Sequence, residues 1–214
     1  MKHVLLLGGT GKTGRLLTTM ALDAGLYVTV LVSNPASINI TSDHLEVIEG
    51  DVLNYIDIEK AVQGQDAVLS TLAKDDENLD IIRISTKKII RAMQHEKVYR
   101  FISLSSIGAG STKTKAGLLF RFWLNITGKR NFFETLTEQE NLLQKSQLHF
   151  TIIQAGTLTG FVQKRKILKT VLPHQIEKGF LFAAKKPGRS QLAAFMLNEL
   201  LNPSWIREII CVHN

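Results

Sequence analysis

The chain has little of the chemistry that stabilises secreted proteins or binds metal ions. Cys211 is its one cysteine, which excludes an internal disulfide. Its six histidines are scattered, and no cysteines, histidines and carboxylates follow one another with the spacing of metal ligands. We therefore expect an intracellular protein that binds no metal.

Long apolar runs are also missing. No stretch reaches the roughly 20 apolar residues that a membrane-spanning helix needs. The first apolar run begins directly after Lys2 and His3, without the separate charged and apolar regions of a signal peptide. These absences predict a cytoplasmic protein without a membrane partner.

Negative charge is in short supply, because 26 lysines and arginines face 19 aspartates and glutamates, which gives a net charge of +7. Such an excess suits nucleic acid, a membrane surface or an anionic cofactor. The basic residues are densest at 113–130 and 164–186, where no nucleic-acid-binding motif occurs. We interpret them as a solvated basic face and expect no nucleic-acid partner.

The order of apolar and helical segments predicts the fold. In the first half, short apolar runs alternate with helix-like stretches, which is typical of repeated βαβ units and a parallel sheet. The expected strands are 2–7, 27–32, 45–49, 66–72 and 99–105, and the expected helices are 12–23, 51–63 and 80–95. Since 214 residues suit one well-packed domain rather than two, we predict a single domain over 1–214. Its expected architecture is α/β, a Rossmann-type doubly wound parallel sheet.

The second half departs from this rhythm. A loop at 105–111 precedes the apolar segment 118–124, which is either a core-facing helix or a wall beside a ligand pocket, with Phe120, Phe122 and Trp123 in that wall. Further helices are expected at 131–145 and at 191–201, the latter with Ser190 as N-cap. Strands are expected at 149–154 and 208–213. We expect part of this half to form a small C-terminal region on the substrate side.

The segment GGTGKTG at 8–14 allows two interpretations. Its GKT suggests the phosphate-binding loop of ATPases and GTPases, but that pattern needs a glycine at position 6, where Leu6 stands. Gly8, Gly11 and Gly14 instead lie between an expected strand and an expected helix, as in a dinucleotide-binding turn. Glycines there let the backbone approach a pyrophosphate, and the helix N-terminus attracts the phosphates. A turn that only packs the helix against the sheet is the alternative.

Ligands of open α/β sheets bind beyond the carboxyl ends of the strands. Lys12 and Thr13, at the start of the first helix, offer a cation and a hydroxyl to the phosphates. Asp51 suits the amino group of adenine, although the N-cap of the following helix is an equally good interpretation. The other residues at these strand ends are Ser33, Asn34, Val52, Leu72, Ala73, Ser105 and Ser106.

The choice between NAD and NADP depends on the residues after the second strand. NAD sites often have an acidic residue there and NADP sites an arginine, whereas this chain has Ser33 and Asn34. No carboxylate repels a 2′-phosphate at this place, and Lys12 is near enough to assist. These features favour NADP over NAD.

Six segments follow one another in the order of a known family: GGTGKTG at 8–14, YVTVLVSNP at 27–35, EGDVLNYIDIEKAVQGQDAVLSTLA at 49–73, FISLSSIGAG at 101–110, SQLHFTIIQAGTLTG at 146–160 and GRSQLAAFMLNELLNP at 188–203. This order resembles the atypical short-chain dehydrogenase/reductases. The likeness is greatest to their NAD(P)H-binding, NmrA-like group, which includes flavin and biliverdin reductases. It covers nearly the whole chain and implies a single NAD(P)-binding Rossmann-like domain that acts as a monomer.

The resemblance implies a role for each matching position. The pyrophosphate would lie against Gly8, Thr10, Gly11, Lys12 and Thr13, in the turn that Gly14 completes. Ser33 would lie at the adenosine ribose, Asp51 and Val52 at the adenine, and Leu72 and Ala73 along the nicotinamide ribose. Ser106 matches a serine near the nicotinamide, with Ser105 beside it, and Gln154, Ala155 and Gly156 match the Arg-Pro-Gly beside the nicotinamide ring.

The chain departs from the family at several of these positions. Ser33 replaces an arginine after the second strand, and Gln154 and Ala155 replace an arginine and a proline. In addition, none of the three tyrosines begins the Tyr-x-x-x-Lys pair that donates a proton in ordinary short-chain dehydrogenases. A dehydrogenase of simple alcohols that uses that pair is therefore not expected.

The sequence leaves two main functions open. The first is an NAD(P)H-dependent oxidoreductase that passes hydride to a small aromatic acceptor of flavin, quinone or tetrapyrrole type. Ser106 would be its catalytic residue and orient the acceptor, unless Ser106 is only a loop hydroxyl. The second is a non-catalytic NAD(P)-binding redox sensor of NmrA type. A sugar-nucleotide epimerase is less favoured, because those enzymes usually keep the tyrosine.

Overall fold

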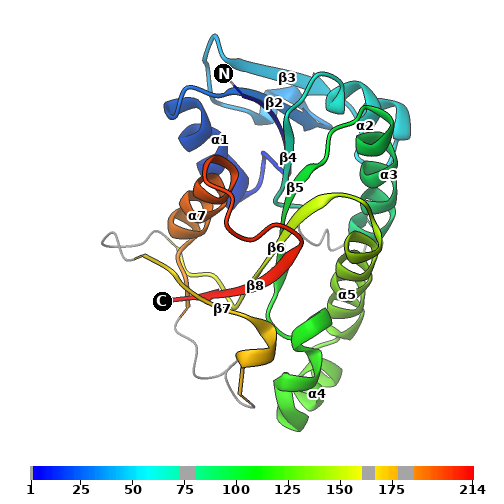
Figure 1. Cartoon of the computed structure of the whole chain (residues 1–214), viewed down its shortest axis with the longest axis vertical. Coiled ribbons are helices and arrows are strands. Elements are labelled where there is room, and N and C mark those ends of the chain that lie inside the picture. Colours follow the sequence, from blue (N-terminus) through cyan, green and yellow to red (C-terminus); the bar gives the residue numbers. More distant parts are fainter. Residues whose placement is uncertain (1, 73–80, 161–166, 178–185) are drawn as a thin grey trace.

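A computed structural model of the chain describes residues 2–72, 81–160, 167–177 and 186–214. Its centre is an eight-stranded sheet with the strand order β3-β2-β1-β4-β5-β6-β8-β7 (Figure 1). The strands are β1 (His3–Leu7), β2 (Tyr27–Val32), β3 (Leu45–Glu49), β4 (Ala67–Ser70), β5 (Arg100–Ser106), β6 (His149–Ala155), β7 (Lys169–Val171) and β8 (Glu208–His213). All are parallel to their neighbours except β7, which pairs antiparallel with β8. The predicted α/β doubly wound sheet is confirmed.

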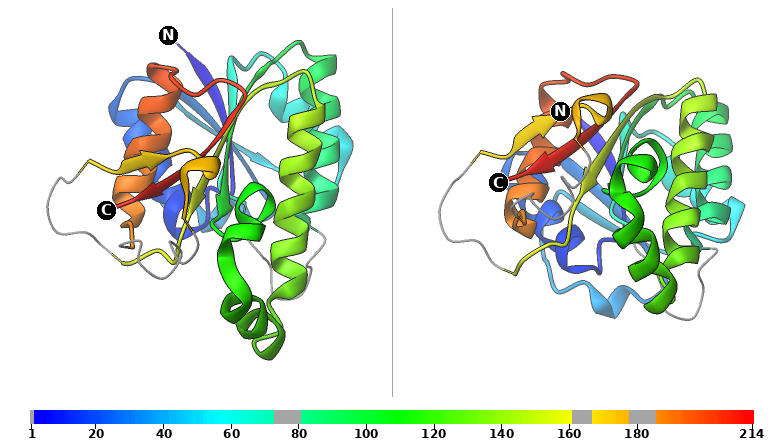
Figure 2. Two further views of the ribbon diagram at one scale, coloured as in Figure 1. Left: turned by 60° about the horizontal axis from the view of Figure 1, so that its bottom comes forward. Right: turned by 90° about the horizontal axis from the view of Figure 1, so that it is seen from below.

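Helices cover both faces of the sheet (Figures 1 and 2). The helices α1 (Lys12–Asp23) and α7 (Arg189–Leu201) lie on one face, and α2 (Tyr55–Val62), α3 (Ile81–His95) and α5 (Arg130–Lys145) lie on the other. The helix α4 (Gly117–Ile126) follows the short 3-10 helix η2 (Gly110–Ala116). Two further 3-10 turns are η1 (Pro35–Ser37) and η3 (Pro173–Gln175). No helix in the described ranges has the length and apolar character to span a membrane.

Strand β1 shows why both faces need a cover. Successive side chains of a strand point to opposite faces, so a strand that is buried on both sides consists almost entirely of apolar residues. Val4 and Leu6 pack towards α1 and α7, whereas Leu5 and Leu7 pack towards α2, α3 and α5. The first of these two cores extends from Val4 to Val212, so both ends of the chain contribute to it.

Most predicted elements occur within a few residues of their expected bounds, but some details were wrong. The helix expected at 51–63 begins only at Tyr55, because Asn54 caps it. The N-cap of α7 is Gly188, not Ser190, and its amide donates to Gln191 Oε1 at 3.0 Å. In addition, β7, a three-residue edge strand that pairs with β8, was not predicted from the sequence.

A buried ion pair ties α7 to the amino end of the sheet. Arg100 Nη2 lies 2.8 Å from Glu199 Oε1, and the side chains are only 13% and 3% exposed. Glu199 also accepts hydrogen bonds from Thr151 Oγ1 and from the amides of Ser204 and Trp205. Burial lowers the pKa of Arg100, and Glu199 opposes that change. One carboxylate therefore joins β5, β6, α7 and the turn before β8.

We expect Glu199→Ala to lower the free energy of unfolding by about 3–5 kcal/mol, because it leaves a buried guanidinium without its partner. Urea denaturation at neutral pH measures this change. The matched control is Glu134→Ala, which removes the exposed Arg130–Glu134 pair and should cost less than about 1 kcal/mol. Equal effects of the two variants would contradict the importance assigned to Glu199.

Candidate functional site

The carboxyl ends of the parallel strands meet at one edge of the sheet. The chain order reverses between β1 and β4, since β2 and β3 lie on one side of β1, whereas β4, β5 and β6 lie on the other. Such a switch point is where open α/β sheets bind ligands. The segments that follow these strands at this edge begin at Gly8, Ser33, Gly50, Thr71, Ile107 and Gly156. Most of the predicted site residues lie at or next to these positions.

The glycine turn after β1 lets the start of α1 lie directly against the backbone of Gly8. Gly8 has a φ of +81°, which favours glycine, and its carbonyl accepts hydrogen bonds from the Gly11 amide at 3.0 Å and from Thr71 Oγ1 at 3.1 Å. A Cβ on Gly14 would lie 2.1 Å from the same carbonyl oxygen. Helix α1 therefore packs directly onto the turn, and the packing role that the sequence left as an alternative is real.

The same turn ends at an uncapped helix N-terminus, which can bind an anion. Gly11 is the N-cap of α1 and offers no side-chain cap, and the first turn of the helix carries no acidic residue. Its leading amides and the positive end of the helix dipole therefore suit phosphate groups. Thr10, Gly11 and Lys12 are exposed beside them, whereas Thr13 is buried. These residues fit the pyrophosphate of a dinucleotide.

Arg15 is a basic residue at this site that the sequence analysis did not single out. Its Nε donates to the Thr10 carbonyl at 2.9 Å, and its Nη2 donates to the Ser37 carbonyl at 3.1 Å. It thereby joins the glycine turn to η1, which follows Ser33 and Asn34. Ser33 is exposed, and the Arg15 guanidinium reaches Ser37, four residues further along the chain.

Asp51 lies in the turn after β3, where it is exposed. Its Oδ1 accepts from the Leu53 amide at 2.8 Å, and its own amide donates to Asp57 Oδ2 at 2.9 Å. The N-cap of α2 is Asn54, so the interpretation of Asp51 as that cap is wrong. Val52 is half-buried next to it.

The end of β4 borders the turn from the other side. The Thr71 hydroxyl donates a hydrogen bond to the Gly8 carbonyl, and Leu72 is half-buried against the core beneath α2 and α3. Ala73, which was predicted to lie along the nicotinamide ribose, falls outside the described residues.

Ser105 and Ser106 end β5 and point to opposite faces, as neighbours in a strand do. Both are half-buried. Ser106 Oγ has a long hydrogen bond of 3.4 Å to the Ile107 carbonyl, which leaves its hydroxyl weakly held. Ser105 Oγ instead lies 2.6 Å from Glu140 Oε1 on α5. The two hydroxyls therefore have different surroundings.

Glu140 is the second residue that sequence reasoning missed. It is only 1% exposed, and burial raises the pKa of its carboxyl, while hydrogen bonds from Ser105, Gln154 and Ser111 oppose that rise. Its sequence signal is weak, since a glutamate on a helix usually faces solvent. Gly110 leaves room for it, because a Cβ there would lie 1.9 Å from Glu140 Oε2.

Gln154 is fully buried beside Glu140. Its Nε2 donates to Glu140 Oε1 at 2.7 Å, and its Oε1 accepts from Thr112 Oγ1 at 2.9 Å and lies 3.3 Å from Cys211 Sγ. Burial, and then the nearby Glu140, raises the pKa of the Cys211 thiol to about 12. The side chain of Gln154 thus supports the loop after β5, while Ala155 and the half-buried Gly156 continue to the edge of the sheet.

A hollow of about 120 Å³ adjoins the same loop. Its lining comes from the loop, α4 and α5, and consists of Gly108, Lys113, Leu124, Asn125, Arg130, Phe133 and Glu134. The predicted aromatic wall is a helix, α4, in which Phe122 is 65% exposed. The side chains of Phe120 and Trp123 fall outside the description.

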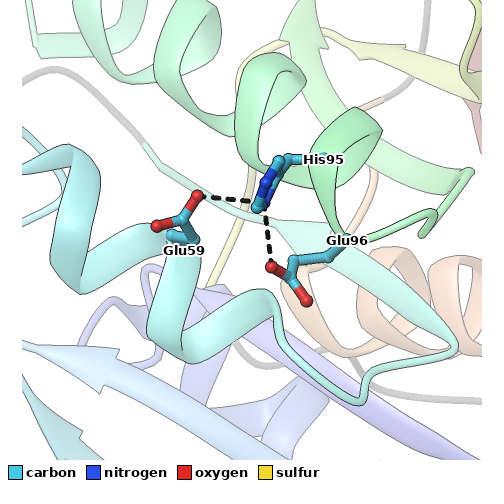
Figure 3. A group of neighbouring side chains, drawn as sticks. All are labelled: Glu59, His95 and Glu96. Atoms are coloured by element: carbon cyan, nitrogen blue, oxygen red, sulfur yellow. Dashed lines mark hydrogen bonds and ion pairs between the residues drawn. The ribbon is translucent and has the colours of Figure 1, made fainter.

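A histidine and two glutamates lie close together between α2 and the end of α3 (Figure 3). His95 Nδ1 lies 3.2 Å from Glu59 Oε1 and 3.1 Å from Glu96 Oε1, which brings together residues that the sequence spacing kept apart. Tyr55 Oη also donates to Glu59 Oε1 at 2.6 Å. His95 and Glu96 come at the end of α3, before β5 begins, so the cluster lies away from the carboxyl edge. A polar contact between α2 and α3 accounts for it.

Comparisons with known proteins agree with this fold. One curated relative, the UPF0659 protein YMR090W of Saccharomyces cerevisiae, is 25% identical over 94% of this chain and 88% of its own length. An anaerobilin reductase, ChuY of Escherichia coli O157:H7, has a similar fold, with a TM-score of 0.81 and 17% identity over 99% of this chain and 96% of that one. A short-chain dehydrogenase/reductase of Veillonella parvula in complex with NADP gives a TM-score of 0.78 and 19% identity over 100% and 94% of the two chains.

A family model described as NAD(P)H-binding matches residues 8–203. The match begins at the first glycine of the turn after β1 and ends beyond α7, so it includes every strand end at the candidate site. The chain therefore belongs to the NAD(P)H-binding family.

Proposed function

We propose that this protein is an NAD(P)H-dependent reductase that passes hydride to a flavin-, quinone- or tetrapyrrole-like acceptor. The observation that carries the proposal is the uncapped start of α1 at the edge where β5 ends in Ser106. The dinucleotide supplies the hydride when it is bound. The residues of the chain bind the dinucleotide, orient the acceptor and supply the proton.

In this proposal the cofactor lies across the switch point, with its pyrophosphate at the glycine turn. Gly8, Thr10, Gly11, Lys12, Thr13 and Gly14 form the turn, Ser33 meets the adenosine ribose, and Asp51 and Val52 meet the adenine. Leu72 and Ala73 follow the nicotinamide ribose, and Ser105, Gln154, Ala155 and Gly156 surround the nicotinamide end. The open first turn of α1 and the exposed Lys12 support this orientation.

Ser106 is the proposed catalytic residue and orients the acceptor. Its long hydrogen bond to the Ile107 carbonyl leaves the hydroxyl available for a ligand. The fold shared with an anaerobilin reductase favours tetrapyrroles among the three acceptor types. We further propose that the protein acts as a monomer in the cytoplasm, without a nucleic-acid or membrane partner.

A non-catalytic redox sensor is the second candidate. The observation that favours it is the burial of Gln154, whose side chain is fully engaged where the related proteins usually have an arginine. A sensor would bind the cofactor but need no acceptor. Cofactor binding and turnover therefore have to be measured separately.

We expect Lys12→Ala and Arg15→Ala each to weaken NADPH binding by about tenfold, because each removes a cation from the phosphate side of the site. NADH binding should fall as much with Lys12→Ala, because the two cofactors share the pyrophosphate, but less with Arg15→Ala, since NADH lacks the 2′-phosphate. Quenching or enhancement of nicotinamide fluorescence measures both affinities. Lys60→Ala, an exposed lysine on α2, is the matched control and should bind both cofactors normally. We also propose a preference for NADP over NAD, which equal losses for NADPH and NADH in Arg15→Ala would contradict.

We expect Ser106→Ala to lower kcat/KM for the acceptor about tenfold, the usual cost of one lost hydrogen bond to a ligand. The assay follows NADPH oxidation by absorbance with FMN, a quinone or biliverdin as acceptor. Cofactor affinity should stay unchanged, which serves as the control. Tight cofactor binding without turnover of any acceptor would contradict the reductase proposal and favour the redox sensor.

A further inference from the structure

The reduction of a flavin, quinone or tetrapyrrole consumes a proton as well as a hydride. The inference that follows rests on the proposed reductase function and concerns the source of that proton. No tyrosine of the chain begins a Tyr-x-x-x-Lys pair, so another donor is needed. A suitable donor is a group that holds a proton near neutral pH and has a path to the carboxyl edge of the sheet.

Glu140 is the candidate for the first condition, because burial raises the pKa of its carboxyl. Its side chain comes from α5 and reaches beneath the loop after β5, where three groups approach its carboxyl oxygens. Ser105 Oγ lies 2.6 Å and Gln154 Nε2 lies 2.7 Å from Oε1, and the Ser111 amide lies 3.3 Å from Oε2. The titratable group that faces it is the Cys211 thiol on β8, whose raised pKa keeps it neutral. No arginine or lysine is among these contacts, and burial therefore raises the pKa of Glu140.

Ser105 meets the second condition. The Gln154 and Ser111 groups are N–H donors and cannot accept a hydrogen bond, whereas a hydroxyl both donates and accepts. When Glu140 is ionised, Ser105 donates to it. When Glu140 is protonated, its own O–H can donate to Ser105 Oγ, which frees the serine hydrogen to turn away. Ser105 is half-buried and ends β5 at the carboxyl edge of the sheet, on the face opposite to Ser106, while Glu140 is closed off from solvent. The relay therefore requires that an acceptor oriented by Ser106 lie across the end of β5.

We propose that Glu140 stores the proton that the reduction consumes and delivers it through the hydroxyl of Ser105. As the acceptor gains a hydride, the Ser105 O–H bond breaks and its proton goes to a nitrogen or oxygen of the acceptor. The Glu140 O–H proton moves to Ser105 Oγ in the same step, so the serine ends as a neutral hydroxyl and Glu140 as a carboxylate. The hydrogen bonds from Ser105, Gln154 and Ser111 then stabilise that carboxylate, and solvent returns the proton.

The test combines variants with a pH profile of kcat for the acceptor that turns over fastest. In the wild type, kcat should fall as pH rises through the pKa of Glu140, because the protonated carboxyl is the donor. Ser105→Ala should lower kcat about 100-fold, the lower range for a lost general acid, and Ser105→Thr should restore much of it. Glu140→Gln should remove the Glu140-dependent fall of kcat with pH.

Two variants serve as matched controls. Ser103→Ala removes a buried hydroxyl from the same face of β5, two residues before Ser105, and Glu138→Gln changes an exposed carboxyl of α5 that pairs with Arg83. Both should keep the wild-type rate and pH profile. Wild-type rates and an unchanged profile in Ser105→Ala and Glu140→Gln would overturn the relay and leave the reductase proposal standing. Failure of every acceptor to react would overturn both.

A second measurement needs neither cofactor nor turnover. The infrared C=O band of the protonated Glu140 carboxyl, identified by its loss in Glu140→Gln, should persist well above the ordinary glutamate pKa of about 4.3. If Glu140→Gln does not fold, carbon-13 labelling of glutamate and nuclear magnetic resonance titration in the wild type give the same information. A carboxyl that titrates at or below the ordinary value would overturn the relay, whatever the activity.

Discussion

The contact between the start of α1 and the end of β1 is the constraint on which the candidate site depends. Gly14 can approach the Gly8 carbonyl only because it has no Cβ, and Thr71 from the next strand binds the same oxygen. This contact holds the start of α1 at the switch point of the sheet, where its leading amides have no side-chain cap. The packing and binding interpretations of the glycines are therefore two results of one geometry, since the packed helix is what presents the anion site.

A second constraint shapes the other half of the site. The loop after β5 is folded around the carboxyl of Glu140, which leaves no room for a Cβ at Gly110 and holds the Ser111 amide and the Gln154 side chain. The glycine turn is thus fixed by backbone contacts, whereas the loop that faces the proposed acceptor is fixed by a titratable group. A change in the charge of Glu140 would therefore change the strength of the hydrogen bonds that hold the loop.

The sequence predicted what local patterns determine. Apolar runs identified the long strands and the helices α1, α3 and α5, and the glycine spacing identified the turn after β1. It did not predict β7, because a three-residue strand has too few side chains to show a period and forms only by pairing with β8. Arg15 and Glu140 were missed for a different reason. Each looks like an ordinary charged residue of a helix, and only the fold brings Arg15 to Ser37 and Glu140 to Ser105.

The family resemblance implies an arginine at position 154, and the glutamine found there has a physical consequence for Glu140. A guanidinium at that position would pair with the carboxyl and hold it ionised, because an opposite charge lowers the pKa of a buried acid. The amide of Gln154 supplies a hydrogen bond without a full charge, so burial still dominates and the pKa of the carboxyl stays raised. What looks in the sequence like the loss of a cofactor-site arginine is, in the fold, the change that allows Glu140 to serve as a proton store in a chain without the tyrosine–lysine pair.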